Sequence, residues 1–313
     1  MDLNPDFLKK FHSTVSQSYG KTSYNNGGRI LMNEFKIKQD ENFSYSLPEK
    51  SYFISRYKKC FELINGVREK RTKKFLDNDV KTLEDLSNDK KYKTFVDNLF
   101  KSLDSGFDEV KKVFGKRFSL SHEMAFLLLS FFDKKDLLFL DIETKSLFYE
   151  TQIITIGCGY FENDDFKTIH LTALNEEGER EILNEFGKLL KNKKTFVTFN
   201  GTVFDIPFID GRMSYYSLES NVSDYHNFDL YFFSRRAFKS QQSSFALKEI
   251  ENKILGKKRK NDISGEDVMY YYERYLDTGN VNFLKPIINH NRDDVVSLSL
   301  LLNKLISIWG GRP

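Results

Sequence analysis

Apolar and polar residues follow a strand-like pattern in the second half of the chain. Short apolar runs rich in β-branched and aromatic residues are separated by turn-forming residues, which predicts consecutive strands. We expect these strands at residues 137–141, 153–161, 166–172 and 195–199, with a short one near 227–230. A helical spacing at about 176–190 precedes the fourth strand, and mostly helices follow it. Three strands, a crossover helix and a further strand predict an α/β fold with a mixed sheet and flanking helices.

The first half of the chain has a different pattern. Residues 1 to about 45 are rich in Ser, Asn, Gly and Tyr and carry little periodicity, so we expect mostly loop with short elements. From 51 to 86, and again from 90 to 132, apolar residues recur at three- and four-residue spacings, which predicts helices. The sequence thus predicts a basic, mainly helical region at 1–135 and an α/β domain at 136–313.

The stretch 60–86 of the first region carries a recognisable motif. Ile64-Asn65-Gly66-Val67 is followed by Phe75-Leu76 and by an apolar pattern over residues 80–86. This order resembles a helix-hairpin-helix, which implies a module that grips a DNA backbone. That family has a second glycine two residues after the first, where this chain has Arg68. We expect sequence-independent phosphate contacts from Arg68, Lys70, Arg71, Lys73 and Lys74. The alternative is a solvated basic helix pair that packs on its neighbour.

Composition indicates a soluble globular protein with an uneven charge distribution. The 313 residues are 40% apolar and 30% charged, with a net charge of +3. Residues 1–135 contain 26 Lys and Arg against 19 Asp and Glu, whereas the remainder contains 22 against 26. A basic front half beside an acidic rear half fits a region that holds nucleic acid joined to a site that requires cations.

Cysteine content and hydropathy indicate where the protein works. Cys60 and Cys158 are the only cysteines, which argues against a disulfide framework and against a cysteine-based zinc site. We expect no signal peptide and no membrane-spanning segment, since the longest apolar cluster, near 124–132, is too short. These observations predict a cytoplasmic protein.

The first candidate for chemistry is the end of the strand at 137–141. Asp141 and Glu143 are separated by one residue, so a strand would point both side chains to the same side. Two like charges at one place repel each other unless a cation or a raised pKa relieves them, and Mg²⁺ prefers carboxylate oxygen. The alternative is a strand that ends in a solvated acidic turn.

Two further acidic positions follow. Asp205 comes shortly after the strand at 195–199, at the kind of strand end where ligands collect in open α/β sheets. Asp294 falls in phase with Leu298 and Leu301 on the apolar stripe of an expected helix, with His290 four residues earlier on the same face. Other acidic residues lie in expected turns or helix starts and are interpreted as solvated caps, namely Asp164, Asp165, Asp262, Glu266 and Asp267.

Together these residues resemble a known family. Asp141-x-Glu143, Asn200-x-x-x-Phe204-Asp205 and His290-x-x-x-Asp294 are similar to the three exonuclease motifs of the DEDD superfamily, the DnaQ-like 3′ to 5′ exonucleases. The likeness is greatest to the YprB-type branch, which has a ribonuclease-H-like fold, and it covers about 137–305. One departure concerns His290, which lies four residues before Asp294. In the superfamily that spacing belongs to a Tyr, whereas a His in the third motif lies five residues before the Asp.

The resemblance implies a two-metal-ion mechanism. Asp141, Glu143, Asp205 and Asp294 would hold two Mg²⁺ or Mn²⁺ ions, and His290 would orient or deprotonate the attacking water. Asn200 and Phe204 would shape the site, although core packing also accounts for Phe204. DNA and RNA with a 3′ end are both open as substrates, and a helicase is an expected partner. The alternative function is a nucleic-acid-binding module whose nuclease centre is silent or accessory.

Overall fold

A mixed sheet of seven strands organises the part of the chain that the structure describes. The structure is a computed structural model that describes residues 15–25, 28–37, 46–148, 150–163, 165–259 and 262–311. The strands are β1 (Val15–Asn25), β2 (Gly28–Ile37), β3 (Leu137–Thr144), β4 (Ile153–Glu162), β5 (Asp165–Ala173), β6 (Thr195–Thr198) and β7 (His226–Asp229). Their order is β1-β2-β5-β4-β3-β6-β7, and only the β3–β6 and β6–β7 pairings are parallel. The predicted α/β, ribonuclease-H-like mixed sheet is confirmed.

Strand β3 lies inside this sheet, and its apolar residues pack into a hydrophobic core on each face. Leu137 and Phe139 pack in the core on one face, and Leu138 and Leu140 pack in the core on the other. This follows from the alternation of side chains along a strand. A strand that is buried on both faces is necessarily apolar throughout, so the two acidic residues at its end stand out.

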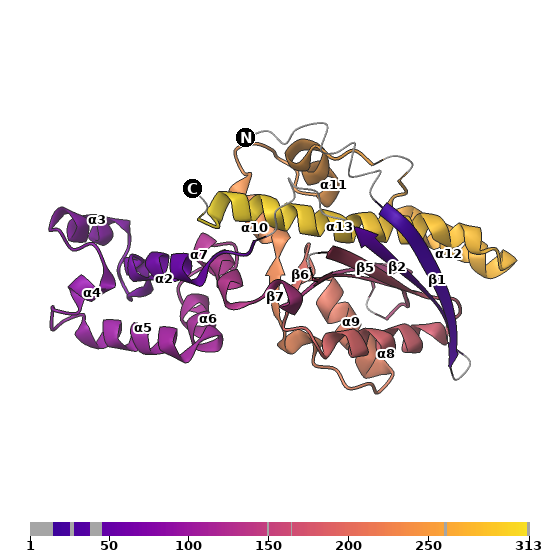
Figure 1. Ribbon diagram of the computed structural model, residues 1–313, viewed down its shortest axis with the longest axis horizontal. Coiled ribbons are helices and arrows are strands. Elements are labelled where there is room, and N and C mark those ends of the chain that lie inside the picture. Colours follow the sequence, from indigo (N-terminus) through magenta and orange to yellow (C-terminus); the bar gives the residue numbers. More distant parts are fainter. Residues whose placement is uncertain are drawn as a thin grey trace.

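Helices cover both faces of the sheet (Figure 1). Helix α13 (Leu284–Trp309) lies along one face, and α8 (Gly178–Leu190) and α9 (Asp205–Tyr215) cover the other. Helices α10 (Leu230–Ala237) and α12 (Gly265–Thr278) pack against α13. A short helix α11 (Leu247–Ile250) continues into a π-helical turn at Glu251–Leu255. No helix among these described segments combines the length and the apolarity that a membrane crossing needs.

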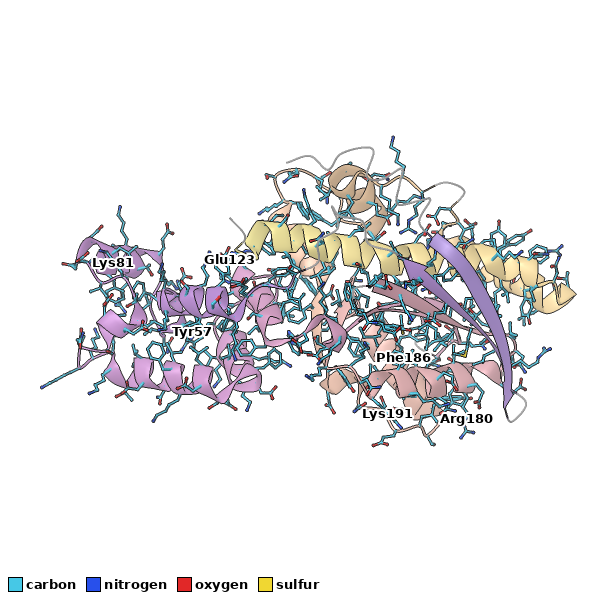
Figure 2. All side chains as sticks on the ribbon, in the orientation of Figure 1. Tyr57, Lys81, Glu123, Arg180, Phe186 and Lys191 are labelled. Atoms are coloured by element: carbon cyan, nitrogen blue, oxygen red, sulfur yellow. The ribbon has the colours of Figure 1, made fainter. Side chains whose placement is uncertain are left out.

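The basic region forms a helical lobe, which is defined here as α2 to α7. Its helices are α2 (Lys50–Lys58), α3 (Glu69–Asp77), α4 (Leu83–Leu86), α5 (Lys93–Ser105), α6 (Phe107–Gly115) and α7 (Glu123–Phe126). Inside the lobe, the Tyr57 hydroxyl donates a hydrogen bond of 2.9 Å to the carbonyl of Leu99 (Figure 2). The Phe126 ring meets Trp309 of α13 edge-on, with ring centroids 5.4 Å apart. The lobe and the sheet domain therefore share one apolar core.

The prediction of mostly loop before residue 45 is wrong for the described strands. Strands β1 and β2 form a hairpin, and β2 pairs with β5 from Ile30↔Ala173 to Ile37↔Phe166. The sequence between the strands is Asn26-Gly27, the dipeptide that two-residue hairpins favour, so a signal was present. The boundary between 135 and 136 stays a prediction, but this hairpin joins the sheet although it precedes the helical lobe.

Candidate functional site

Four acidic residues from three distant segments meet at one end of the sheet. Asp141 and Glu143 come from the end of β3, Asp205 begins α9, and Asp294 lies in α13. The Asp205 carboxylate accepts a hydrogen bond of 3.0 Å from the backbone N–H of Ile142, which lies between the first two acids. Burial, followed by repulsion from Asp294, Glu143 and Asp205, raises the pKa of Asp141 well above its usual value. Each acid is therefore within electrostatic reach of the others.

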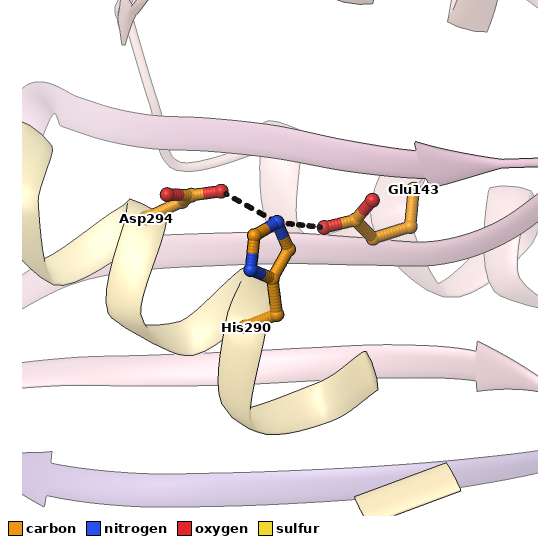
Figure 3. Close-up of side chains that lie close together, drawn as sticks. All are labelled: Glu143, His290 and Asp294. Atoms are coloured by element: carbon orange, nitrogen blue, oxygen red, sulfur yellow. Dashed lines mark ion pairs between the residues drawn. The ribbon is translucent and has the colours of Figure 1, made fainter. Parts of the chain in front are cut away.

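His290 joins this group of acids, as Figure 3 shows. Its Nε2 lies 3.7 Å from Oε1 of Glu143 and 3.5 Å from Oδ2 of Asp294. One ligand atom from each of these three residues lies within 4.8 Å of the other two. Carboxylate oxygens and an imidazole nitrogen converging at this distance are the donors that a divalent cation accepts. The site thus fits a metal ion.

Burial makes it costly in free energy to ionise this group of acids when no cation is bound. It is the main cause that raises the pKa of Glu143 well above its usual value, and repulsion from Asp294 and Asp205 adds to it. Burial likewise raises the pKa of Asp205 to about 7. A cation bound among these carboxylates would favour their charged forms and offset the repulsion. The raised pKa values of these carboxyl groups are therefore those expected of a site that binds a cation.

A buried amide fixes the position of Asp141. Asn291, which is 0% exposed, donates hydrogen bonds from Nδ2 to Oδ2 of Asp141 at 2.7 Å and to its backbone carbonyl at 3.1 Å. Oδ1 of Asn291 lies 2.6 Å from Nδ1 of His170, whose Nε2 lies 3.0 Å from the hydroxyl of Thr168. Because Asn291 uses its N–H group on Asp141, the His170 proton must lie on Nδ1. This chain of hydrogen bonds holds one carboxylate at a fixed angle.

His290 and Asp294 are held by charged partners of their own. Oδ1 of Asp262 lies 2.7 Å from Nδ1 of His290, which leaves Nε2 directed at the acids. The Arg259 guanidinium, which is 3% exposed, donates a hydrogen bond to Asp294. Glu251 in turn accepts bonds of 2.8 and 2.7 Å from Arg259. The interpretation of Asp262 as a solvated cap is wrong, because its side chain is buried against His290.

Sequence reasoning did not assign roles to these supporting residues. Arg259 and Glu251 lie far from the motifs in sequence, and no periodicity marks them. Asn291 is different, because it adjoins His290 in sequence and points a hundred degrees away from it around the helix. Its place on the helix could therefore have identified Asn291 from the sequence as the polar residue that faces β3.

The family follows from comparison with known proteins. The family model of the RNase H superfamily matches residues 138–306, which is more than half of the chain. This chain belongs to the RNase H superfamily. The uncharacterized protein YprB of Bacillus subtilis (strain 168) is 25% identical over 169 residues, which are 53% of this chain and 41% of YprB. The suspected family is thus confirmed, and the chain spans about two-fifths of that relative.

A solved structure also resembles this RNase H superfamily chain. The family B DNA polymerase from the hyperthermophilic archaeon Pyrobaculum calidifontis is similar over 54% of this chain and 24% of the polymerase, with 16% identity and a TM-score of 0.44. Nucleases of this superfamily generally use divalent metal ions, and the cluster of Glu143, His290 and Asp294 has room for one.

The two residues expected to shape the nuclease site lie in the turn after β6. Asn200 is exposed with a positive φ of 64°, and its backbone N–H donates a 2.7 Å hydrogen bond to the Asp229 carboxylate. The same carboxylate accepts a bond of 3.0 Å from the N–H of Thr202. The half-buried Phe204 packs against Phe208, with ring centroids 5.5 Å apart. Packing thus accounts for Phe204, whereas Asn200 borders a cavity.

The five basic residues expected to contact phosphate lie in the helical lobe rather than among the acids. Arg68, Lys70 and Arg71 are exposed at the start of α3, a helix that buries none of its residues. Gly66 has a φ of 76° and allows the chain to turn before them. The Arg71 guanidinium donates a 3.2 Å hydrogen bond to the carbonyl of Gly66. Their contact with phosphate stays a prediction.

Proposed function

We propose that this protein is a metal-dependent 3′ to 5′ exonuclease that hydrolyses phosphodiester bonds of DNA or RNA. The observation that carries the proposal is the convergence of Asp141, Glu143, Asp205, His290 and Asp294 at one end of the sheet. The four carboxylates would hold two Mg²⁺ or Mn²⁺ ions. Divalent ions in such a pair supply a nucleophilic water at neutral pH and stabilise charge on the leaving oxygen.

His290 has the geometry of a group that orients and deprotonates water. When Asp262 accepts the proton on Nδ1, the neutral imidazole presents the lone pair of Nε2 to the space between Glu143 and Asp294. With the ions held by the four carboxylates alone, a water in this space can donate its proton to Nε2 as its oxygen attacks phosphorus, and the bond from phosphorus to the 3′ oxygen of the preceding nucleotide breaks. Asp262 is thus a positioning residue that selects the imidazole tautomer.

The exposed cations of α3 favour a role in holding the substrate. We propose that Arg68, Lys70 and Arg71 contact phosphates, and that Asn200 meets the terminal nucleotide. The alternative function, a nucleic-acid-binding module with a silent or accessory nuclease centre, rests on the same cations. A helicase partner and a cytoplasmic location stay predictions from the sequence.

End-labelled strands test the proposal. Single- and double-stranded DNA and RNA are incubated with Mg²⁺ or Mn²⁺, and the products are resolved by length. We expect stepwise shortening from the 3′ end, release of nucleoside 5′-monophosphates, and no cleavage by Asp141→Ala. Salt-sensitive binding without turnover would favour the alternative instead, and cleavage of a circular strand would show an endonuclease.

A further inference from the structure

Two neighbouring cavities form a groove along α10, which we call the α10 groove. The first, of about 560 Å³, is bordered by Asn200 and Tyr231, and the second, of about 690 Å³, by Arg236 and Lys239. Both are also lined by Arg235 of α10 and by Ser243 and Phe245 of the segment that follows it, so they meet between the helix and that segment. None of these residues belongs to the group of acids described above.

The groove leads from the helical lobe toward the end of the sheet that carries the acids. Asn200, at its first end, follows β6, and β6 pairs in parallel with β3, whose end carries Asp141 and Glu143. Ser121, at its second end, directly precedes the N-cap residue of α7 in the lobe. In Figure 1, α10 lies between the lobe and the sheet domain. A chain molecule that follows this groove would therefore run from the lobe to the candidate nuclease site.

The groove is positively charged and lacks counter-charges. Arg235, Arg236 and Lys239 are exposed, and no ion pair involves any of them within the part of the chain that the structure describes. No acidic residue lines either cavity. Lys188, by contrast, pairs with Glu185 at 2.6 Å. Neighbouring unpaired cations repel one another and attract an anionic polymer.

Aromatic rings lie among these cations. Tyr231, Phe199 and Phe245 line the first cavity, and the Arg235 guanidinium lies over the Tyr231 ring, 5.6 Å from its centroid. Aromatic faces bind unpaired bases by stacking, whereas a duplex hides its bases. Cations alone would suit any polyanion, but cations beside aromatic rings suit a single strand. An acidic peptide would not need the rings.

We propose that the α10 groove binds a single strand of nucleic acid and leads its 3′ end to the acids. The inference rests on the proposed nuclease function and adds the strand form of the substrate. The bases would stack on Tyr231 and Phe245, and the phosphates would lie against Arg235, Arg236 and Lys239. A duplex would have to open before its end could reach the site.

Strand binding tests the groove separately from cleavage. The affinity of fluorescent oligothymidylate is measured by anisotropy at several salt concentrations, with every variant made in the Asp141→Ala chain. The test variant is Arg235→Gln with Arg236→Gln. The control is Arg180→Gln with Lys191→Gln, which removes two exposed cations on the opposite side of the sheet from α13 (Figure 2). Tyr231→Ala tests stacking, and Tyr231→Phe keeps the ring.

The expected results are specific to the groove. Loss of two phosphate contacts lowers the slope of log affinity against log salt by about 1.4, at about 0.7 for each contact. Tyr231→Ala weakens binding roughly 5- to 150-fold, and Tyr231→Phe restores it. If the test pair matches the control pair in slope and affinity, the groove does not bind the strand and the inference is overturned.

Two further outcomes separate the groove from the proposed function. If the parent chain cleaves no nucleic acid but the groove variants lose strand affinity, the nuclease proposal fails and the groove assignment stands. If the parent chain binds polyglutamate more tightly than the oligonucleotide, and Arg235→Gln with Arg236→Gln abolishes that binding, the groove is a docking site for an acidic protein. That result would overturn the inference.

Discussion

The substitution Gly157→Ala tests whether the active geometry depends on the buried amide of Asn291. Gly157 lies opposite Asp141 in the β3–β4 pairing. A Cβ atom at position 157 would lie 2.1 Å from Oδ1 and 2.7 Å from Cγ of Asn291. Both distances are below any van der Waals contact, so Asn291 must move away and release Asp141 and His170.

The loss in free energy of unfolding caused by Gly157→Ala has two parts. Overpacking a close-packed interior costs about 1–3 kcal/mol, and a lost hydrogen bond to the charged Asp141 adds about 1.5–3 kcal/mol. We therefore expect the free energy of unfolding to fall by about 2.5–6 kcal/mol. Since a displacement of 1 Å in a catalytic group can lower the rate about 100-fold, we expect a loss in kcat of about that size.

A second glycine on the same strand provides a matched control. A Cβ atom at Gly159 would lie 2.5 Å from Cζ of Phe166 and 2.7 Å from Cγ1 of Val295, which are apolar atoms away from Asp141. Gly159→Ala should therefore destabilise the fold but keep most of the activity of the folded protein. Unfolding in urea and cleavage of a labelled strand are measured on both variants at a temperature where both are folded. Equal activity in the two variants would refute the positioning role of Asn291.

Three further predictions concern the charged residues around the site. Asp262→Ala removes the acceptor that fixes the His290 tautomer, so we expect cleavage to slow about 10- to 100-fold in single-turnover assays, and an unchanged rate would exclude that role. Arg259→Gln removes the cation that lies between Glu251 and Asp294 and should lower the free energy of unfolding in urea by about 3–5 kcal/mol, with Arg259→Lys less affected. Burial lowers the pKa of His170 to about 4, so its contribution to stability is present above pH 6.5 and is lost as the pH falls toward 4. That loss is about 3 kcal/mol and should be absent in His170→Gln, which unfolding in urea at both pH values checks.

The residues of the site that could be predicted from the sequence are those that lie within or directly after an apolar pattern. Asp141, Glu143, Asp205 and Asp294 each follow or interrupt a strong apolar pattern, and such an interruption in a buried element is informative because burying a charge is costly. The supporting residue Arg259 interrupts no such pattern. Its partners Glu251 and Asp294 lie 8 and 35 positions away in sequence. Only the tertiary fold brings them together.

The strands of the sheet domain were predicted for a similar reason. The residues of β3 alternate between two cores, so the run is apolar throughout and short, which suits a buried strand. Strand β1 is polar along much of its length and lies at the edge of the sheet, whereas β2 pairs on both sides and mixes polar residues with buried apolar ones. An edge strand faces solvent more widely, and its hydropathy therefore resembles that of a loop. The Asn26-Gly27 pair was the better signal there.

No hydrogen bond reaches the Glu143 carboxylate from the described residues, and this gives a last prediction. Asp141 has the amide of Asn291, Asp205 has the N–H of Ile142, and Asp294 has Arg259. Glu143 faces His290 at 3.7 Å, and the charge of Arg259 offsets part of the repulsion on it. The pKa of Glu143 is raised, so ionising it destabilises the folded chain progressively as the pH rises above about 4.5. Glu143→Gln removes that charge and should raise the melting temperature of the metal-free protein at pH 8. Added Mn²⁺ should reverse the order, because the native chain has the fuller set of ligands and gains more from binding the ion. Calorimetry with and without Mn²⁺ measures both effects. A Glu143→Gln chain that melts below the native one in the presence of chelator would show that repulsion among the acids does not limit stability.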